Sequence, residues 1–151
     1  MSDSWYAAHT HHWADWPLPA LLRAKEVTRT RISLVLPARD EAATVGRLVG
    51  RLRVALVEEV GLLDEVVVID SDSTDDTAAV AAAAGATVHR AAEVRPDLGT
   101  VPGKGEALWK SLFVTDGDLV VFLDSDVQSF DPAFVVGLLG PLVTDQACSE
   151  G

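Results

Sequence analysis

DLVVFLDSDV, residues Asp118 to Val127, is the stretch of sequence on which the prediction of this fold depends. Five apolar residues, Leu119 to Leu123, run directly into Asp124, Ser125 and Asp126, a pattern typical of a fully buried strand that ends in two carboxylates. Two carboxylates one residue apart repel each other unless a divalent cation offsets their charge. The alternative is a solvated acidic turn in which Asp124 caps a neighbouring segment. The buried strand before the acids favours a metal site.

The same alternation of apolar strand and helix is repeated upstream and downstream of this stretch. Apolar runs predict strands at 32–36, where Pro37 stops the run, and at 65–69, 86–89 and 119–123. Helical spacing and cap signals predict helices from 45 to about 61 and from a cap at Ser73 or Thr74 to Gly85. Two more are predicted, one from about 107 to 113 after the segment 103–106, and one with Pro132 at its first position. Strands that alternate with helices form parallel sheets with right-handed crossovers. The sequence therefore predicts an α/β fold, a mostly parallel sheet with flanking helices.

Polar motifs follow these strands or open the next helix, namely PARDE at 37–41, DSDSTDDT at 70–77, PGKGE at 102–106 and DSDV at 124–127. In open parallel sheets, ligands bind outside the C-terminal edge of the strands, where all four motifs are expected to meet. The glycines beside Lys104 let backbone approach a ligand, and the ammonium can pair with a phosphate. Lys104 belongs to no Walker A loop, and taken alone it reads as an exposed loop lysine. Together the motifs predict a site for a nucleotide diphosphate and a cation.

The composition narrows the classes of partner. Of the 151 residues, 48% are hydrophobic, which is enough for one domain with a core. The formal net charge of -11 argues against nucleic acid and anionic membranes as partners. The single cysteine, Cys148, cannot form an internal disulfide, and neither a leader peptide nor a spanning apolar segment is evident. We therefore expect a cytoplasmic protein.

Residues 1–30 differ from the rest because they hold most of the tryptophans and histidines: Trp5, Trp13, Trp16, His9, His11 and His12. The histidines have no acidic or thiol partner at a defined spacing, so we expect an arm whose aromatic rings pack on the domain rather than a metal site. A short helix is predicted after Pro17. The predicted organisation is an arm at 1–30, an α/β domain at 31–143 and an atypical tail at 144–151.

Four segments of the chain resemble a known family: LVLPARDEAATVG at 34–46, VVVIDSDSTDDT at 66–77, PGKGEALWKSL at 102–112 and VVFLDSDV at 120–127. They look like the Rossmann-like nucleotide-sugar domain of the GT-A glycosyltransferases, and specifically like the glucosyl-3-phosphoglycerate synthases of actinobacteria. The resemblance runs from about residue 13 to 143. The pair PGKGEALWKSL and DSDV carries the specific part, whereas the first segment is shared with many family-2-like transferases.

The resemblance implies contacts to the nucleotide sugar. Pro37, Ala38 and Glu41 match the segment that lines the uridine, with the glutamate on the ribose. Ser71 matches a contact to uracil, and Lys104 matches a lysine near the nucleotide.

The resemblance also implies a metal and a reaction. Asp124, Ser125 and Asp126 match the DXD motif, in which the last aspartate binds Mg²⁺ or Mn²⁺ that bridges the diphosphate of UDP-glucose. The implied reaction transfers glucose, with retention, to the 2-hydroxyl of 3-phosphoglycerate, and the metal stabilises the departing UDP. The resemblance does not assign a catalytic residue within this chain.

The chain departs from the family pattern in three places. Arg39-Asp40 stands where a hydrophobic residue followed by Asn or Asp is usual, and Asp72 stands where a smaller residue, often Gly, is usual. The third departure is length. Family members are about twice as long, form homodimers, and place the acceptor site in their second half. We therefore expect a truncated chain that binds the donor and lacks the acceptor half.

Two other interpretations remain open at this point. One is a nucleotide-sugar-binding fragment without catalysis. The other is a phosphatase of the haloacid dehalogenase type, in which the first Asp of an Asp-X-Asp motif is the nucleophile. That motif normally follows the first strand, whereas here it follows the fourth predicted strand.

Overall fold

The computed structural model describes residue 7 and residues 10–149 of the chain. They form two compact units, the segment Thr30–Phe130 and the described parts of residues 1–29 and 131–151. Trp5 and His9 lie outside the described residues. The predicted boundaries after residues 30 and 143 stay predictions.

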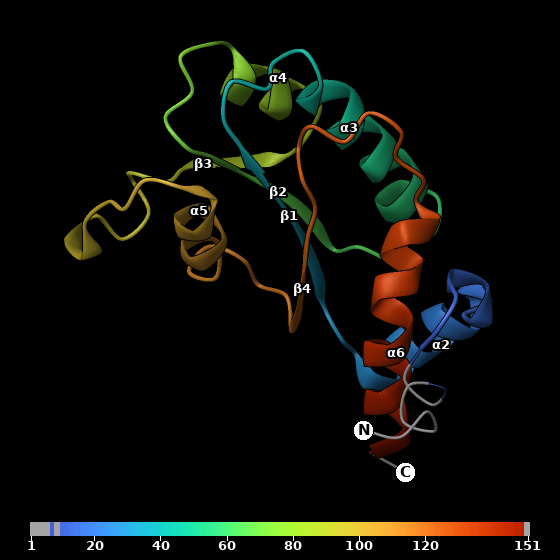
Figure 1. The fold of residues 1–151 in the computed structure, drawn as a ribbon. Coiled ribbons are helices and arrows are strands. Elements are labelled where there is room, and N and C mark those ends of the chain that lie inside the picture. The colour runs from blue at the N-terminus through green and yellow to red at the C-terminus, as the bar shows by residue number, and fades with distance from the viewer. Residues whose placement is uncertain (1–6, 8–9, 150–151) are drawn as a thin grey trace. The chain divides into compact units, whose positions relative to one another are not determined.

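The larger unit is built on a parallel sheet of four strands in the order β3-β2-β1-β4 (Figure 1). The strands are β1 (Ile32–Ala38), β2 (Glu65–Asp70), β3 (Thr87–Arg90) and β4 (Leu119–Phe122). In register, Val35 of β1 pairs with Val67 of β2 and with Phe122 of β4. The predicted parallel α/β architecture is confirmed.

Helices cover both faces of this sheet. They are α3 (Val45–Leu52), which continues as a π-helical turn η2 (Arg53–Glu58), α4 (Thr77–Ala83) and α5 (Lys104–Ser111). Figure 1 shows α5 on the opposite side of the sheet from α3. Alternate strand residues point to opposite faces, so Val35, Val67 and Ile69 pack in one core cluster with Ala107 of α5.

The first strand runs past Pro37, which was predicted to stop it. The carbonyl of Val35 accepts a hydrogen bond from Leu123 N. Backbone groups two residues apart in a strand point to the same side, so the backbone of Pro37 also faces β4. Strand β4 has ended there, and the proline ring replaces an N–H that would have had no strand partner.

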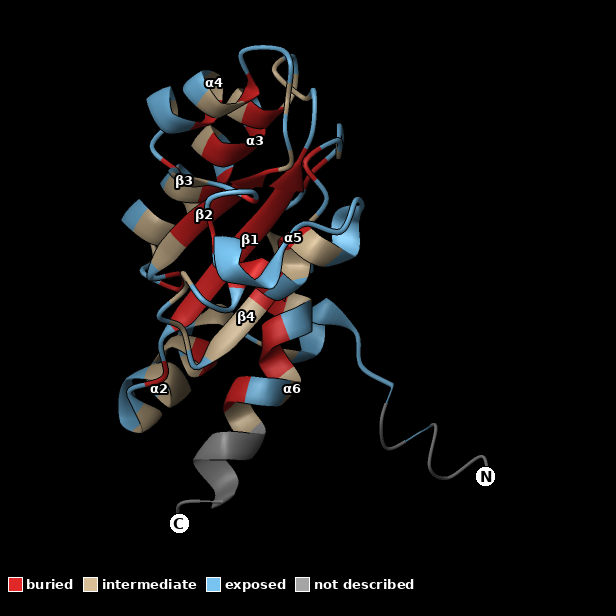
Figure 2. Ribbon diagram, turned by 90° about the vertical axis from the view of Figure 1, so that its left-hand side faces the viewer, coloured by how far each residue is buried: buried red, intermediate tan, exposed pale blue. Residues whose placement is uncertain are grey.

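The prediction that residues 119–123 form a fully buried strand was wrong. β1 is buried over its whole length, whereas in β4 only Val121 is buried and the Phe122 side chain is 41% exposed (Figure 2). Among the described residues β4 pairs only with β1, so it is an edge strand with one face incompletely covered. An apolar run predicts a strand but not its position in the sheet.

The helix after β2 begins later than predicted. Neither Ser73 nor Thr74 caps it, because α4 begins at Thr77 with Asp76 at the N-cap position. The helix ends as predicted, with Gly85 just beyond it at a φ of 97°, a conformation that glycine adopts without strain.

The smaller unit contains the helices α2 (Leu18–Thr28) and α6 (Ala133–Ser149) and a single turn η1 (Trp13–Asp15). The predicted helix after Pro17 is therefore present. Helix α6 buries Val135, Leu139 and Val143, while Phe134 and Leu138 remain exposed. Trp13 and Trp16 lie against Gly137 and Gly140 of α6. A side chain at Gly140 would overlap the ring of Trp16, and one at Gly137 would be in tight contact with Trp13.

Candidate functional site

A cavity of about 180 Å³ opens at the C-terminal ends of β1, β2 and β4. It is lined by residues from all four polar motifs: Pro37, Ala38, Arg39, Glu41, Ser71, Gly103, Lys104, Ser125 and Asp126. Every site residue predicted from the sequence except Asp124 is in this lining, and Asp124 is bonded to Lys104 beside it. The roles of these residues stay predictions, but the sheet does bring them together.

The loop after β1 is fastened to the loop after β2. Asp40 N donates to Ser73 Oγ at 2.9 Å, and Thr74 N donates back to Asp40 Oδ1 at 2.7 Å. Glu41 N donates to Thr77 Oγ1 at 2.8 Å. The two residues expected to cap α4 instead bind Asp40, and this holds the two loops as one wall of the cavity.

Two aspartates of these loops have a left-handed backbone conformation. Asp40 and Asp72 have φ values of 55° and 57°, in the left-handed region. Aspartate enters this region more readily than most residues other than glycine. Asp72 therefore occupies a backbone conformation that glycine also adopts without strain.

The loop that carries the two aspartates is anchored by the serine between them. Ser125 is buried, and its Oγ donates to the carbonyl of Pro37 at 2.8 Å. Thr44 Oγ1 lies 3.1 Å from the Ser125 carbonyl and 3.0 Å from Glu41 Oε2. The hydroxyl of Ser125 thus binds the protein, while Asp124 and Asp126 on either side of it remain exposed.

Lys104 and Arg39 are the two cationic residues of the cavity lining, and Lys104 is the one bonded to the acidic loop. This lysine is the first residue of α5, and its Nζ donates to Asp124 Oδ1 at 2.6 Å. This hydrogen bond, helped by the charges of Asp126 and Glu41, holds the pKa of Lys104 above its usual value. The lysine is therefore protonated at neutral pH and places a positive charge in the cavity lining.

The acidic residues fit a metal that is shared with a ligand. Within the described part of the chain, no three His, Cys, Asp or Glu side chains are grouped closely enough to hold a metal by themselves. Asp126 and Glu41 line the cavity and Asp124 is bonded to Lys104 beside it, but these three carboxylates do not form such a group. Mg²⁺ commonly binds through one or two carboxylates together with substrate phosphates, a set that this site could complete.

Comparison with known proteins gives the family. Residues 33–147 match the family model described as Glycosyl transferase family 2. The chain belongs to this family. Membership argues against the phosphatase interpretation, since all four polar motifs lie within the matched segment.

The relatives of this family-2 chain include proteins named as phosphoglycerate glycosyltransferases. Glucosyl-3-phosphoglycerate synthase of Mycolicibacterium paratuberculosis is 46% identical over 142 residues, which is 94% of this chain and 42% of that protein. The crystal structure of mannosyl-3-phosphoglycerate synthase from Rubrobacter xylanophilus matches with a TM-score of 0.87 and 39% identity, over 92% of this chain and 45% of that one.

A third relative was solved with its ligands. Glucosyl-3-phosphoglycerate synthase from Mycobacterium tuberculosis, in complex with Mn²⁺, UDP-glucose and phosphoglyceric acid, matches with a TM-score of 0.79 and 44% identity. That match covers 89% of this chain and 46% of the relative. The chain thus spans less than half the length of these three relatives. The resemblance to this group and the GT-A type of fold are confirmed.

Sequence reasoning missed two residues of the cavity lining, Arg39 and Gly103. Both lie inside motifs that were recognised, PARDE and PGKGE, so their position next to assigned residues was the signal that could have identified them.

No helix in the described part of the chain is both long and apolar enough to cross a membrane. The cytoplasmic location stays a prediction.

Proposed function

We propose that this chain forms the nucleotide-sugar site of a glycosyltransferase that transfers glucose from UDP-glucose to 3-phosphoglycerate. The observation that carries the proposal is the cavity at the C-terminal sheet edge, where the assigned residues of four separate motifs meet. The relative solved with UDP-glucose and phosphoglyceric acid supports the choice of substrates.

In this proposal the wall made by the loops after β1 and β2 receives the nucleoside. Pro37 and Ala38 contact the base, and Ser71 binds the uracil. Glu41 accepts hydrogen bonds from the ribose hydroxyls, and Thr44, bonded to its Oε2, keeps the carboxylate oriented. A residue that both lines the cavity and is held by a neighbour loses little conformational freedom on binding.

The part of the cavity lined by Lys104 and Asp126 receives the diphosphate. Asp126, with Asp124 beside it, holds Mg²⁺ or Mn²⁺ together with the phosphate oxygens. The bound metal neutralises negative charge on the departing diphosphate. Lys104 adds a positive charge at the same place, and its contact with Asp124 keeps the ammonium near the phosphates in the absence of a ligand.

Three further parts of the proposal concern the whole protein. They are 3-phosphoglycerate as acceptor, retention of configuration at the sugar, and a homodimeric state. The bound phosphoglyceric acid of the relative supports the first. The family resemblance supports the other two.

A mannosyl donor is the second candidate, because mannosyl-3-phosphoglycerate synthase matches with a TM-score of 0.87. The two candidates share the cavity, the metal and the acceptor. They differ in the hexose that is transferred. Titration with both uridine and guanosine nucleotide sugars also tests whether they differ in the base.

The test is calorimetric titration of the chain with UDP-glucose, GDP-glucose and GDP-mannose, each with and without Mn²⁺. We expect binding of UDP-glucose that requires the metal and is abolished by Asp126→Asn. The matched control is Asp116→Asn, which alters an exposed aspartate before the N-terminal end of β4 and should bind as the wild type does. Failure of a folded wild-type chain to bind any nucleotide sugar would refute the proposal, and preference for GDP-mannose would select the second candidate.

A further inference from the structure

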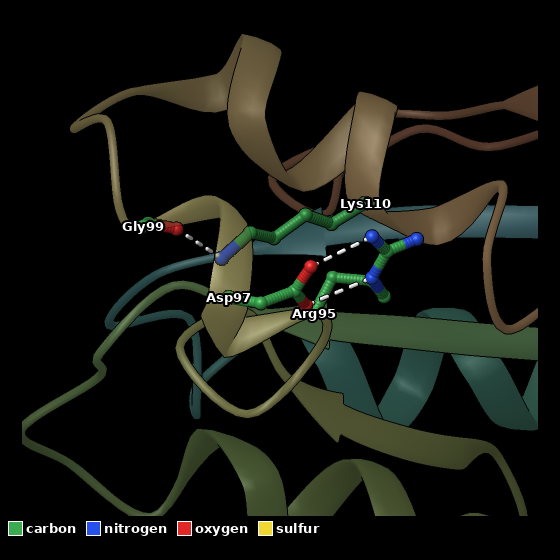
Figure 3. A network of polar contacts seen from close by, with 4 residues as sticks. All are labelled: Arg95, Asp97, Gly99 and Lys110. Atoms are coloured by element: carbon green, nitrogen blue, oxygen red, sulfur yellow. Dashed lines mark hydrogen bonds and ion pairs between the residues drawn. The ribbon is translucent and has the colours of Figure 1, made fainter.

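The most deeply buried charged side chain of the described residues lies outside the cavity. Lys110, on α5, is 0% exposed, and its Nζ donates to Ala91 O at 2.8 Å. The same Nζ donates to Gly99 O at 3.0 Å (Figure 3). Its third contact is an ion pair with Glu106 Oε1, one helical turn earlier, at 3.0 Å. An ammonium has three N–H groups, and all three have an acceptor here.

Glu106 extends this network to the same loop. Its side chain is 11% exposed, and Oε1 also accepts a hydrogen bond from Val101 N at 3.0 Å. Two side chains on one face of α5 therefore bind the backbone of the 91–103 segment at three points: Ala91, Gly99 and Val101.

The loop has little else to hold its second half. Residues 95–105 are all exposed, so apolar burial does not fix them. The ion pair between Arg95 and Asp97 closes the turn η3 (Pro96–Leu98) within the loop (Figure 3). Outside the loop, the contact of this pair that adds to the anchor is that of the Arg95 guanidinium, which lies over the exposed Phe113 ring at 5.0 Å from its centroid. Segments with few buried contacts open readily unless specific bonds hold them.

The end of this loop forms part of the cavity. Gly103 and Lys104 follow Val101 by two and three residues, and both line the cavity. A shift of the loop would therefore move the ammonium of Lys104 away from Asp124 and from the place proposed for the diphosphate.

We propose that Lys110 is a positioning residue, whose buried ammonium, with Glu106, holds the 91–103 loop so that Lys104 is presented to the diphosphate of the donor. The inference rests on the proposed function and goes beyond it by naming a residue that contacts no ligand. An apolar residue could fill the same volume, but it would leave the carbonyls of Ala91 and Gly99 without this donor.

The test is a double-mutant cycle between Lys110 and Lys104, measured as the Kd of UDP-glucose with Mn²⁺. Lys110→Met alone should raise the Kd about tenfold, and in a Lys104→Ala background the same change should raise it less than about twofold. Lys25→Met is the matched control for the substitution and should leave the Kd unchanged. A rise by the same factor in both backgrounds would show a general loss of structure and overturn the proposal, as would an unchanged Kd.

Hydrogen exchange provides a readout that is independent of ligand. Lys110→Met should speed exchange in residues 91–103 while that of β1 and β2 stays as in the wild type, and unchanged exchange in the loop would overturn the anchoring. If Lys110→Met fails to fold, Glu106→Gln is the substitute, because it weakens the bonds of Glu106 to Lys110 and to the backbone of Val101. Its effect is measured in the same way, by the Kd of UDP-glucose in the two Lys104 backgrounds and by hydrogen exchange in residues 91–103.

Failure of this inference and failure of the proposed function give different results. A wild-type chain that binds no nucleotide sugar refutes the function, and with it the role of Lys110 toward the donor. A wild type that binds, with a Lys110→Met variant that binds equally well, refutes the inference alone.

Discussion

Two glycines that stand two residues apart in PGKGE should respond in opposite ways to the same substitution. Gly103 has a φ of 132° and a ψ of 164°, a conformation that residues with a side chain rarely adopt. Gly105 lies in the first turn of α5 with an ordinary φ, and an added Cβ would meet nothing within 4 Å at either position. Steric crowding is therefore equal, and backbone strain alone separates the two positions.

Backbone strain sets the size of the effect. Gly103→Ala should lower the free energy of unfolding by about 1–3 kcal/mol, the cost of holding a non-glycine residue in this region. Gly105→Ala should raise it by about 0.4–1 kcal/mol, because alanine reduces the conformational entropy of the unfolded chain. If the 103–104 backbone relaxes instead of bearing the strain, Lys104 moves, and the Kd for UDP-glucose should rise in Gly103→Ala but not in Gly105→Ala.

The assay is urea unfolding followed by far-ultraviolet circular dichroism, with calorimetric titration on the same samples. Gly105→Ala serves as the control, since it adds the same methyl group in the same motif. Equal stability and equal donor affinity of the two variants would refute the assignment of strain to Gly103.

Three further predictions concern the groups around the cavity. Ser125→Ala should lower the free energy of unfolding by about 1–3 kcal/mol, because it leaves the carbonyl of Pro37 without the hydrogen bond from the Ser125 hydroxyl. Unchanged stability in thermal unfolding together with loss of UDP-glucose binding in titration would show that the hydroxyl serves the ligand instead. Thr44→Val should weaken UDP-glucose binding several-fold by releasing the carboxylate of Glu41, whereas Thr44→Ser should bind as the wild type does, and equal Kd values for the two variants would contradict this. The hydrogen bond from Lys110 lowers the pKa of Glu106, so the ionised carboxylate stabilises the folded chain fully above the usual pKa of 4.5, and this stabilisation is lost as the pH falls through the lower pKa of the folded state. In urea unfolding across acid pH, the free energy of unfolding should therefore decline less steeply for Glu106→Gln than for the wild type.

The predictions from sequence succeeded where they depended on local pattern. The apolar runs located all four strands, and the polar residues after them were expected at one sheet edge, where the cavity lies. They failed where a residue chooses a partner from another segment. Ser73 and Thr74 have the side chains of helix caps, yet they bind Asp40, which lies more than thirty residues away in the chain.

The position of a strand within the sheet was equally hidden. The runs at 32–36 and 119–123 are both continuously apolar, but β1 is central and β4 lies at the edge of the described sheet. Hydrophobic pattern reports how well a segment forms a strand, whereas its burial depends on which other segments pair with it.

The sequence by itself determined the class of fold, the family and the set of polar motifs, because each of these depends on residue types at short spacing. Only the tertiary structure decided that Ser125 anchors the acidic loop, that Gly103 rather than Gly105 requires a glycine, and that Lys110 is buried beneath the loop of Lys104. The physical reason is that a hydroxyl, a glycine or an ammonium can serve many purposes, and the partners brought near by the packing of distant segments select one of them.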